Sequence, residues 1–205
     1  MTEKMLNPSS TVFLVDDEPG VRDSLSWLLE SRGLRVKTFA EGESLLGHLE
    51  GPVAGCFLLD VRMEPMSGPL LQEELKRRGH TNPVLFLTGH GDVAMAVAAL
   101  KNGAFDFIEK PYGDNALVDR IEQALAIDIA SRSVSARGEE RRVRLTSISE
   151  REREVMERII AGKLNKIIAD DLGISMRTVE VHRARVFAKL GVRSAVELIQ
   201  FLSAT

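Results

Sequence analysis

The chain of 205 residues lacks several features that define whole classes of protein. Its single cysteine, Cys56, excludes an internal disulfide framework and a metal site with several cysteine ligands. No apolar run approaches the ~20 residues that a membrane span needs, and residues 1–10 have no apolar signal-peptide core. Hydrophobic residues make up 44% and charged residues 28%, as in globular proteins, so disorder, collagen and coiled coil are poor fits. We therefore expect a protein of the cytoplasm, without a membrane partner.

Charge divides the chain into two unequal parts. Residues 1–130 hold 12 Lys and Arg against 20 Asp and Glu, a net charge of −8. Residues 131–205 hold 15 against 10, a net charge of +5. This asymmetry indicates an acidic module joined to one that meets a polyanion, although chance variation among solvated surfaces gives the same pattern.

Short apolar runs alternate with helical patterns through the first 126 residues. Candidate strands are Thr11–Val15, Arg35–Phe39, Gly55–Leu59, Val84–Leu87 and Phe105–Ile108. Candidate helices are Val21 to Gly33, Ser44–Leu49, Pro69 to Gly79, Asp92–Asn102 and Asn115–Ile127. Strands that are apolar throughout suit a sheet covered on both faces. The alternation predicts an α/β fold with a doubly wound, five-stranded parallel sheet.

A polar break separates this region from an all-helical one. Residues 128–147 are charged and have no clear apolar period, and the sequence leaves open whether they form coil or extend the fifth helix. Two capping boxes follow, at Ser149–Glu152 and Ser194–Glu197. Between them, a short helical segment, a glycine turn and a longer helix with a polar face are typical of a helix-turn-helix. We predict domains at residues 1–127 and 145–205, joined by a linker at 128–144, and the second is a small four-helix domain.

Polar residues follow the strands of the predicted sheet at their carboxyl ends. They are Asp16, Asp17, Asp60, Thr88 and Lys110. Each taken alone is more often a turn or cap residue, but these strand ends meet at one edge of an open parallel sheet. Carboxylates without His or Cys suit Mg²⁺. One carboxylate can attack a phosphoryl group while Lys and Thr bind its remaining oxygens.

The sequence resembles the receiver domain of two-component response regulators over residues 10–126. The matching stretches are Val12–Glu18, Leu58–Gly68, Val84–Asp92 and Gly103–Pro111. The resemblance implies a sheet in the order 2-1-3-4-5 with five surrounding helices. It also assigns roles to residues: Asp60 as phosphoacceptor, Asp17 as direct ligand of Mg²⁺, Asp16 as ligand through water, the Arg62 backbone carbonyl as a further ligand, Thr88 as switch hydroxyl, Lys110 as phosphoryl-binding lysine and Phe107 as switch aromatic. A cis Lys110–Pro111 bond is implied as well.

One position departs from the receiver pattern. The family usually has proline four residues after the phosphoacceptor, whereas this chain has Glu64 there, followed by Pro65. The spacing from Asp60 to Gly68 is kept, so the loop length is intact. Glu64 adds a negative charge near an acidic site, unless it points into solvent.

The segment Leu145–Gly191 resembles a LuxR-type helix-turn-helix. The matching residues include Ser149–Glu152, Asn165-Lys166, Leu172–Ser175, Thr178–His182 and Lys189-Leu190. With the receiver, the whole chain looks closest to the FixJ branch of the NarL/FixJ regulators. A recognition helix that starts at Ser175 would place its first turns in the major groove of DNA.

Side chains of this segment suit contacts with DNA. Lys166 and Thr178 lie near helix N-termini, where phosphate binds. Arg177, Arg183 and Arg185 can pair with phosphate or guanine, although a solvated surface is the alternative. By resemblance, Glu180, Val181 and Ala184 face bases.

The two resemblances imply a transcriptional regulator and not an enzyme. A histidine kinase would phosphorylate Asp60, the receiver would dimerise, and two recognition helices would bind promoter DNA. RNA polymerase is a further expected partner. Two alternatives remain. A receiver altered by Glu64 would give a phosphorylation-independent DNA-binding regulator. A phosphatase of the haloacid dehalogenase type would need an Asp two residues after the nucleophile, where this chain has Arg62.

Overall fold

The computed structural model describes residues 10–89 and 93–203 and divides the chain into two compact units. Unit 1 comprises residues 1–132 and unit 2 residues 133–205. Asp92, where the sequence predicts the start of the fourth helix, lies outside the described residues. Among the residues described, no helix is long and apolar enough to cross a membrane.

Unit 1 is built on a parallel sheet in the order β2-β1-β3-β4-β5, as predicted. Its strands are β1 (Thr11–Val15), β2 (Arg35–Phe39), β3 (Gly55–Asp60), β4 (Val84–Thr88) and β5 (Asp106–Glu109). The three central strands are buried along their whole length because helices cover both faces, which explains why they read as continuous apolar runs.

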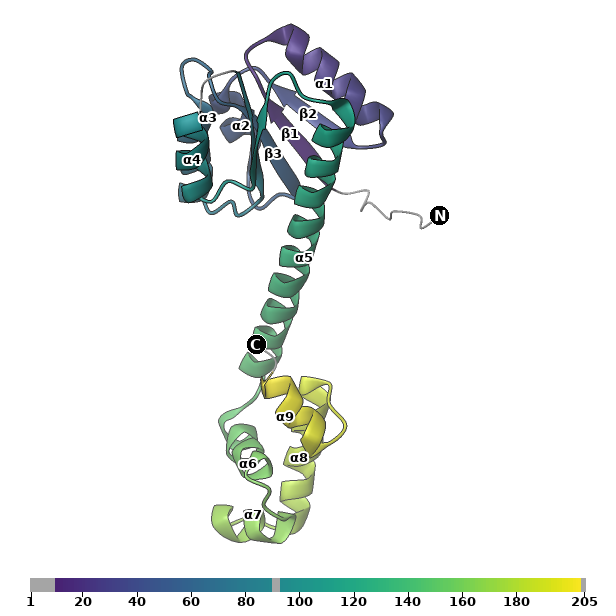
Figure 1. Ribbon diagram of the computed structural model, residues 1–205. Coiled ribbons are helices and arrows are strands. Elements are labelled where there is room, and N and C mark those ends of the chain that lie inside the picture. Colours follow the sequence, from purple (N-terminus) through teal and green to yellow (C-terminus); the bar gives the residue numbers. More distant parts are fainter. Residues whose placement is uncertain (1–9, 90–92, 204–205) are drawn as a thin grey trace. The chain divides into compact units, whose positions relative to one another are not determined.

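Five helices cover the sheet (Figure 1). They are α1 (Pro19–Ser31), α2 (Gly42–His48), α3 (Gly68–Arg77), α4 (Val93–Lys101) and α5 (Asp114–Thr146). Helices α1 and α5 pack on one face with side chains such as Leu25 and Ile121. Helices α2, α3 and α4 pack on the other with Leu45, Leu71 and Ala99. The doubly wound α/β fold is therefore confirmed.

Helix α5 includes residues 128–144, for which the sequence left coil and helix open. The division into units falls within this helix, between Arg132 and Ser133. Ion pairs one turn apart support its second half, Glu139 with Arg142 and Glu140 with Arg144.

Asp128 fastens α5 to the amino-terminal edge of the sheet. Its carboxylate is buried and accepts hydrogen bonds from the Gly55 amide at 2.9 Å, Asn82 Nδ2 at 3.0 Å and Arg132 Nε at 2.8 Å. Gly55 has a φ of +138°, and a Cβ there would collide with the Thr11 backbone, so only glycine fits. The carboxylate thus joins three segments that are distant in sequence.

Replacing Asp128 with Ala is expected to destabilise unit 1 by about 2–4 kcal/mol, because the Gly55 and Asn82 donors lose their buried acceptor. Urea unfolding of the full chain measures this effect. Asp119→Ala, at an exposed position on the same helix, is the matched control. Equal stability of the two variants would contradict the role given to Asp128.

Unit 2 is the predicted all-helical domain. It contains α6 (Glu150–Ile160), α7 (Asn165–Leu172), α8 (Met176–Leu190) and α9 (Ala195–Ser203). The predicted capping box is present at Ser149, whose side chain accepts from the Glu152 amide. Left-handed glycines, Gly173 and Gly191, end α7 and α8. Side chains from all four helices form the core, among them Val155, Ile168, Val179 and Leu198.

A buried carboxylate makes the stability of unit 2 depend on pH. Lys189 donates to Glu152 Oε2 at 2.6 Å and thereby lowers the pKa of Glu152 to about 2, against the opposing effect of burial. The amide of Ser149 also donates to this carboxylate. Because the pKa is lower in the folded chain than its ordinary 4.5, ionised Glu152 stabilises the fold above about pH 4.5. This contribution is lost as the pH falls toward about 2.

Glu152→Gln is therefore expected to lower the melting temperature of unit 2 near pH 6 and to lower it less near pH 3. Calorimetry of the full chain at both pH values tests this, with Glu157→Gln, at an exposed position of α6, as control. A loss in melting temperature that does not change with pH would refute the assignment.

Candidate functional site

Three side chains meet at the carboxyl edge of the sheet, as predicted. Asp16 follows β1, Asp60 ends β3 and Lys110 follows β5. Lys110 Nζ lies 2.7 Å from Asp60 Oδ1 and 3.2 Å from Asp16 Oδ2. The ammonium group therefore bridges two carboxylates that are 44 positions apart in the chain. The Lys110–Pro111 bond is cis, as the resemblance implied.

Backbone groups orient both carboxylates. The Arg62 amide donates to Asp60 Oδ2 at 2.7 Å, and the Glu18 amide donates to Asp16 Oδ1 at 2.9 Å. In addition, Arg22 Nη1 donates to the Asp16 carbonyl at 2.7 Å. The contact of Arg22 was not predicted, since one arginine near the start of a helix carries no sequence signal.

Burial and charge act in opposite directions on the pKa values of the site. Burial raises the pKa of Asp60, and the hydrogen bond and charge of Lys110 lower it only in part, so the net change is upward. Burial lowers the pKa of Lys110, but the nearby Asp60 and Asp16 raise it more, so this ammonium stays charged. A carboxylate with a raised pKa is more basic and therefore a better nucleophile than a solvated one.

Thr88 and Asp17 lie at the same edge, whereas Phe107 lies within β5. Thr88 ends β4, is buried, and donates from Oγ1 to the Gly89 carbonyl at 3.0 Å. Asp17 follows Asp16 and is exposed. Phe107 on β5 is partly buried, with its ring centroid 5.9 Å from that of Phe86.

The oxygen atoms at this edge are of the kind that a hard cation prefers, but they form only part of a coordination shell. Asp16, Asp17 and Asp60 carry carboxylate oxygens, and the resemblance adds the backbone carbonyl of Arg62; such a set would match the preference of Mg²⁺ for oxygen. Over residues 10–89 and 93–203, however, no three His, Cys, Asp or Glu side chains are gathered closely enough to hold a metal ion. Lys110 instead holds Asp16 and Asp60 together.

The loop after Asp60 packs closely against the site. A Cβ at Gly68 would collide with the Asp60 carbonyl oxygen, which explains why glycine stands at this point of the motif. Glu64, which replaces the usual proline, is exposed, and the Glu64–Pro65 bond is cis.

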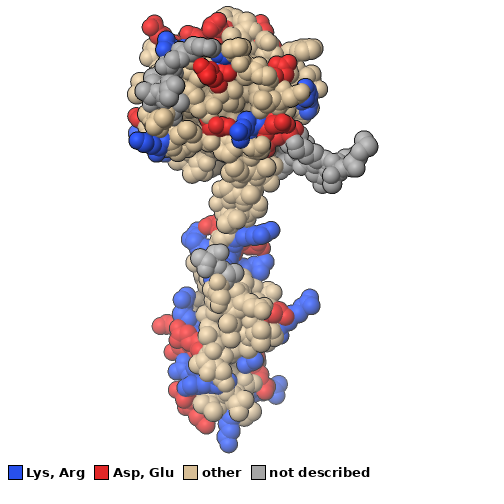
Figure 2. Space-filling model, viewed as in Figure 1, with Lys and Arg blue, Asp and Glu red and all other residues tan. Residues whose placement is uncertain are grey.

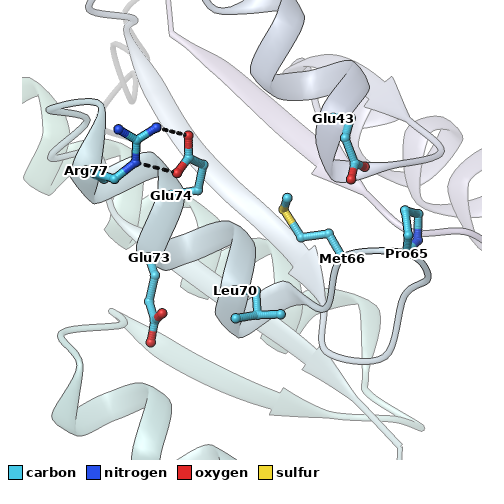
Figure 3. A pocket seen from close by; sticks show the side chains of 7 residues that line it. All are labelled: Glu43, Pro65, Met66, Leu70, Glu73, Glu74 and Arg77. Atoms are coloured by element: carbon cyan, nitrogen blue, oxygen red, sulfur yellow. Dashed lines mark hydrogen bonds and ion pairs between the residues drawn. The ribbon is translucent and has the colours of Figure 1, made fainter.

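A groove of about 390 Å³ lies beside this loop (Figure 3). Pro65 and Met66 of the loop line one side, and Leu70 of α3 lies near them. The lining also includes Glu43, Glu73 and the Glu74–Arg77 ion pair. The acidic rim therefore adds negative charge near the loop that carries Glu64.

Helix α8 presents the predicted DNA-contact residues in two groups. Arg177, Glu180, Val181, Ala184 and Arg185 are exposed, at spacings that place them on adjacent turns. Arg183 instead lies over the ring of Phe187, with its guanidinium carbon 5.1 Å from the ring centroid.

The two remaining predicted DNA contacts lie near helix starts. Thr178 bonds to the N-cap residue Ser175, with 2.8 Å between the hydroxyl oxygens. Lys166 is exposed in the first turn of α7. In Figure 2, Lys and Arg side chains are spread over the visible face of the helical unit, interspersed with acidic ones.

Comparison with known proteins agrees with this arrangement. Residues 12–122 match the response regulator receiver domain, and residues 146–202 match the bacterial regulatory proteins of the luxR family. The C4-dicarboxylate transport transcriptional regulatory protein DctR of Rhodobacter capsulatus is 50% identical over 194 residues, which cover 93% of this chain and 98% of DctR.

Two solved structures are also similar over most of the chain. Response regulator StyR has a TM-score of 0.90 at 40% identity, covering 96% of this chain and 100% of StyR. Full-length FixJ from B. japonicum has a TM-score of 0.60 at 41% identity, covering 94% and 95% of the two chains. Such matches define a two-component response regulator that acts as a transcription factor. The chain belongs to the NarL/FixJ family of these regulators. Its two domains imply a histidine kinase partner and binding to DNA.

Proposed function

We propose that Asp60 is the phosphoacceptor of this regulator. The observation that carries the proposal is the bridge of Lys110 between Asp60 and Asp16 at the carboxyl edge of the sheet. A carboxylate oxygen of Asp60 attacks the phosphorus of a phosphohistidine, the bond from phosphorus to the histidine nitrogen breaks, and an aspartyl phosphate forms. Lys110 and Thr88 then bind the phosphoryl oxygens.

Mg²⁺ is the resident cofactor that we propose for the same site. Asp16, Asp17, Asp60 and the Arg62 carbonyl would hold it, and it would neutralise charge on the phosphoryl oxygens. The oxygen-only donor set supports this choice. Without the ion, Lys110 is the positive charge that balances Asp16 and Asp60.

Phosphorylation acts by shifting an existing equilibrium between two receiver conformations. Thr88 ends β4 and Phe107 lies on β5, where Phe107 packs in the same core cluster as Ala99 of α4. The shifted receiver forms a homodimer, and a two-fold dimer places two α8 helices on an inverted repeat in promoter DNA. The chain then regulates transcription through RNA polymerase in the cytoplasm and has no enzymatic turnover of its own.

This function goes with a receiver at residues 1–127, a linker at residues 128–144 and a DNA-binding domain at residues 145–205. The family matches end at residue 122 and begin at residue 146, on either side of the proposed linker. Helix α5 fills the interval between them.

Arg177→Ala is expected to weaken binding of the phosphorylated protein to its promoter DNA, because an exposed cation at the start of α8 is lost. The slope of log affinity against log salt should fall by about 0.9 if Arg177 contacts a phosphate. Fluorescence anisotropy at several salt concentrations measures both quantities. Arg142→Ala, at an exposed and ion-paired position of α5, is the control. Unchanged affinity at every salt concentration would remove Arg177 from the interface.

A further inference from the structure

A groove of about 580 Å³ lies in unit 2, lined by the turn between α6 and α7, one side of α8 and the start of α9. Leu164 and Met176 bring apolar side chains to this groove. Positive charge comes from Lys163, Lys166 and Arg183. Among the described residues that line the groove, none is Asp or Glu. The groove therefore combines apolar surface with an excess of positive charge.

Leu164 is an unusual residue for its position in the fold. It is the N-cap residue of α7, and its side chain makes no capping hydrogen bond. The other three helices of unit 2 follow Ser149, Ser175 and Ser194, whose hydroxyls each accept a hydrogen bond from a backbone amide of the first turn. A polar N-cap side chain stabilises a helix, whereas leucine is disfavoured there. Leucine at this position therefore costs α7 a favourable cap.

Burial does not offset the missing cap, because the side chain of Leu164 is 72% exposed. Met176, in the first turn of α8, is 48% exposed. Both side chains line the same groove, so their exposed parts belong to one surface. Apolar side chains that neither pack nor support the local structure indicate a surface that binds a partner.

The groove lies on the side of α8 that is turned away from most of the predicted base contacts. Met176 and Arg183 are seven positions apart, so they lie on one side of the helix. At about 100° per residue, Val181 and Arg185 point roughly 160° away from Arg183. The Arg183 guanidinium lies over the Phe187 ring. A partner can therefore occupy the groove while α8 contacts DNA.

We infer that this groove is a docking site for a protein partner that inserts an acidic segment with one large apolar side chain. Lys166 and Arg183 attract the carboxylates, while Leu164 and Met176 contact the apolar side chain. Phosphate groups of DNA would pair with the cations but leave both apolar side chains in water. The inference rests on the proposed function, in which RNA polymerase is the protein expected beside the regulator on promoter DNA.

The test measures binding of purified RNA polymerase holoenzyme to fluorescent promoter DNA, with and without the full chain loaded with beryllofluoride and Mg²⁺. Binding of the regulator alone to the same DNA is measured by fluorescence anisotropy. Leu164→Ser removes the apolar side chain and supplies a cap, so the melting temperature of unit 2 should be retained or increased. Val143→Ser, at an exposed apolar position of α5, is the matched control.

We expect the wild-type regulator to change the affinity of the polymerase for the promoter, and Leu164→Ser to reduce that change at least about fivefold. Lys163→Gln should reduce it by about twofold and make it less sensitive to salt. The affinity of Leu164→Ser for DNA alone should equal that of the wild type. Val143→Ser should match the wild type in both measurements.

Three results would overturn the inference. The first is a wild-type regulator that binds the DNA and leaves polymerase binding unchanged. The second is an undiminished effect of Leu164→Ser on the polymerase. The third is a loss of about tenfold in the affinity of Leu164→Ser for DNA alone, which would make the groove a DNA contact. A loaded wild-type chain that does not bind DNA would instead contradict the proposed function on which the inference rests.

Discussion

Replacing Asp60 with Asn is expected to abolish phosphorylation of the receiver. The amide keeps the shape of the side chain but is a poor nucleophile, so no stable acyl phosphate forms. Acetyl phosphate with Mg²⁺ is a suitable donor, and the added phosphoryl group is detected by intact-protein mass spectrometry. Loss of the phosphorylated species to below about one hundredth of the wild-type level is the expected result.

Asp17→Asn and Asp106→Asn separate the possible causes of such a loss. Asp17 lies at the proposed metal site, so its variant should react slowly. Asp106 forms an ion pair with Arg120 away from the site, so its variant should react like the wild type. Phosphorylation of Asp60→Asn at the wild-type rate and at another carboxylate would contradict the assignment of Asp60.

Replacing Lys110 with Met should have the second-largest effect. Lys110 is the group that bridges Asp60 and Asp16, and removing one preorganised donor from a developing charge costs about 10²–10³ in rate. Without the ammonium, only the hydrogen bond from the Arg62 amide still opposes burial and the charge of Asp16, so the pKa of Asp60 rises further. The phosphorylation rate of the variant should therefore fall more steeply on acidification than that of the wild type.

Stopped-flow measurement of phosphorylation across a pH series tests both the rate and the pH dependence. Lys101→Met, at an exposed position on α4, is the matched control. A rate within about twofold of the wild type at every pH would show that the bridge has no part in phosphoryl transfer.

The fold could be predicted from the sequence because each strand and helix carried its own signal. Strands β1, β3 and β4 are buried on both faces, and such strands read as unbroken apolar runs. The meeting of Asp16, Asp60 and Lys110 followed as well, since parallel strands end at a common edge.

Contacts between side chains distant in sequence could not be predicted in the same way. Asp128 accepts hydrogen bonds from three donors because α5 passes close to the starts of β3 and β4. The bond from Arg22 to the Asp16 carbonyl depends on the side-chain rotamer of Arg22, which leaves no periodic trace in the sequence. The second half of α5 could not be predicted as helix, because the residues beyond Arg132 are charged and have no apolar period. Ion pairs rather than an apolar face support the helix there.

Analytical ultracentrifugation tests the central claim, that modification of Asp60 controls assembly of the regulator. The full chain is measured with Mg²⁺, with and without beryllofluoride as a mimic of the aspartyl phosphate, and Asp60→Asn is measured in the same way. The account predicts a monomer that becomes a dimer with the mimic, and no change in the variant. A wild type that stays monomeric while fluorine NMR shows beryllofluoride bound would contradict it.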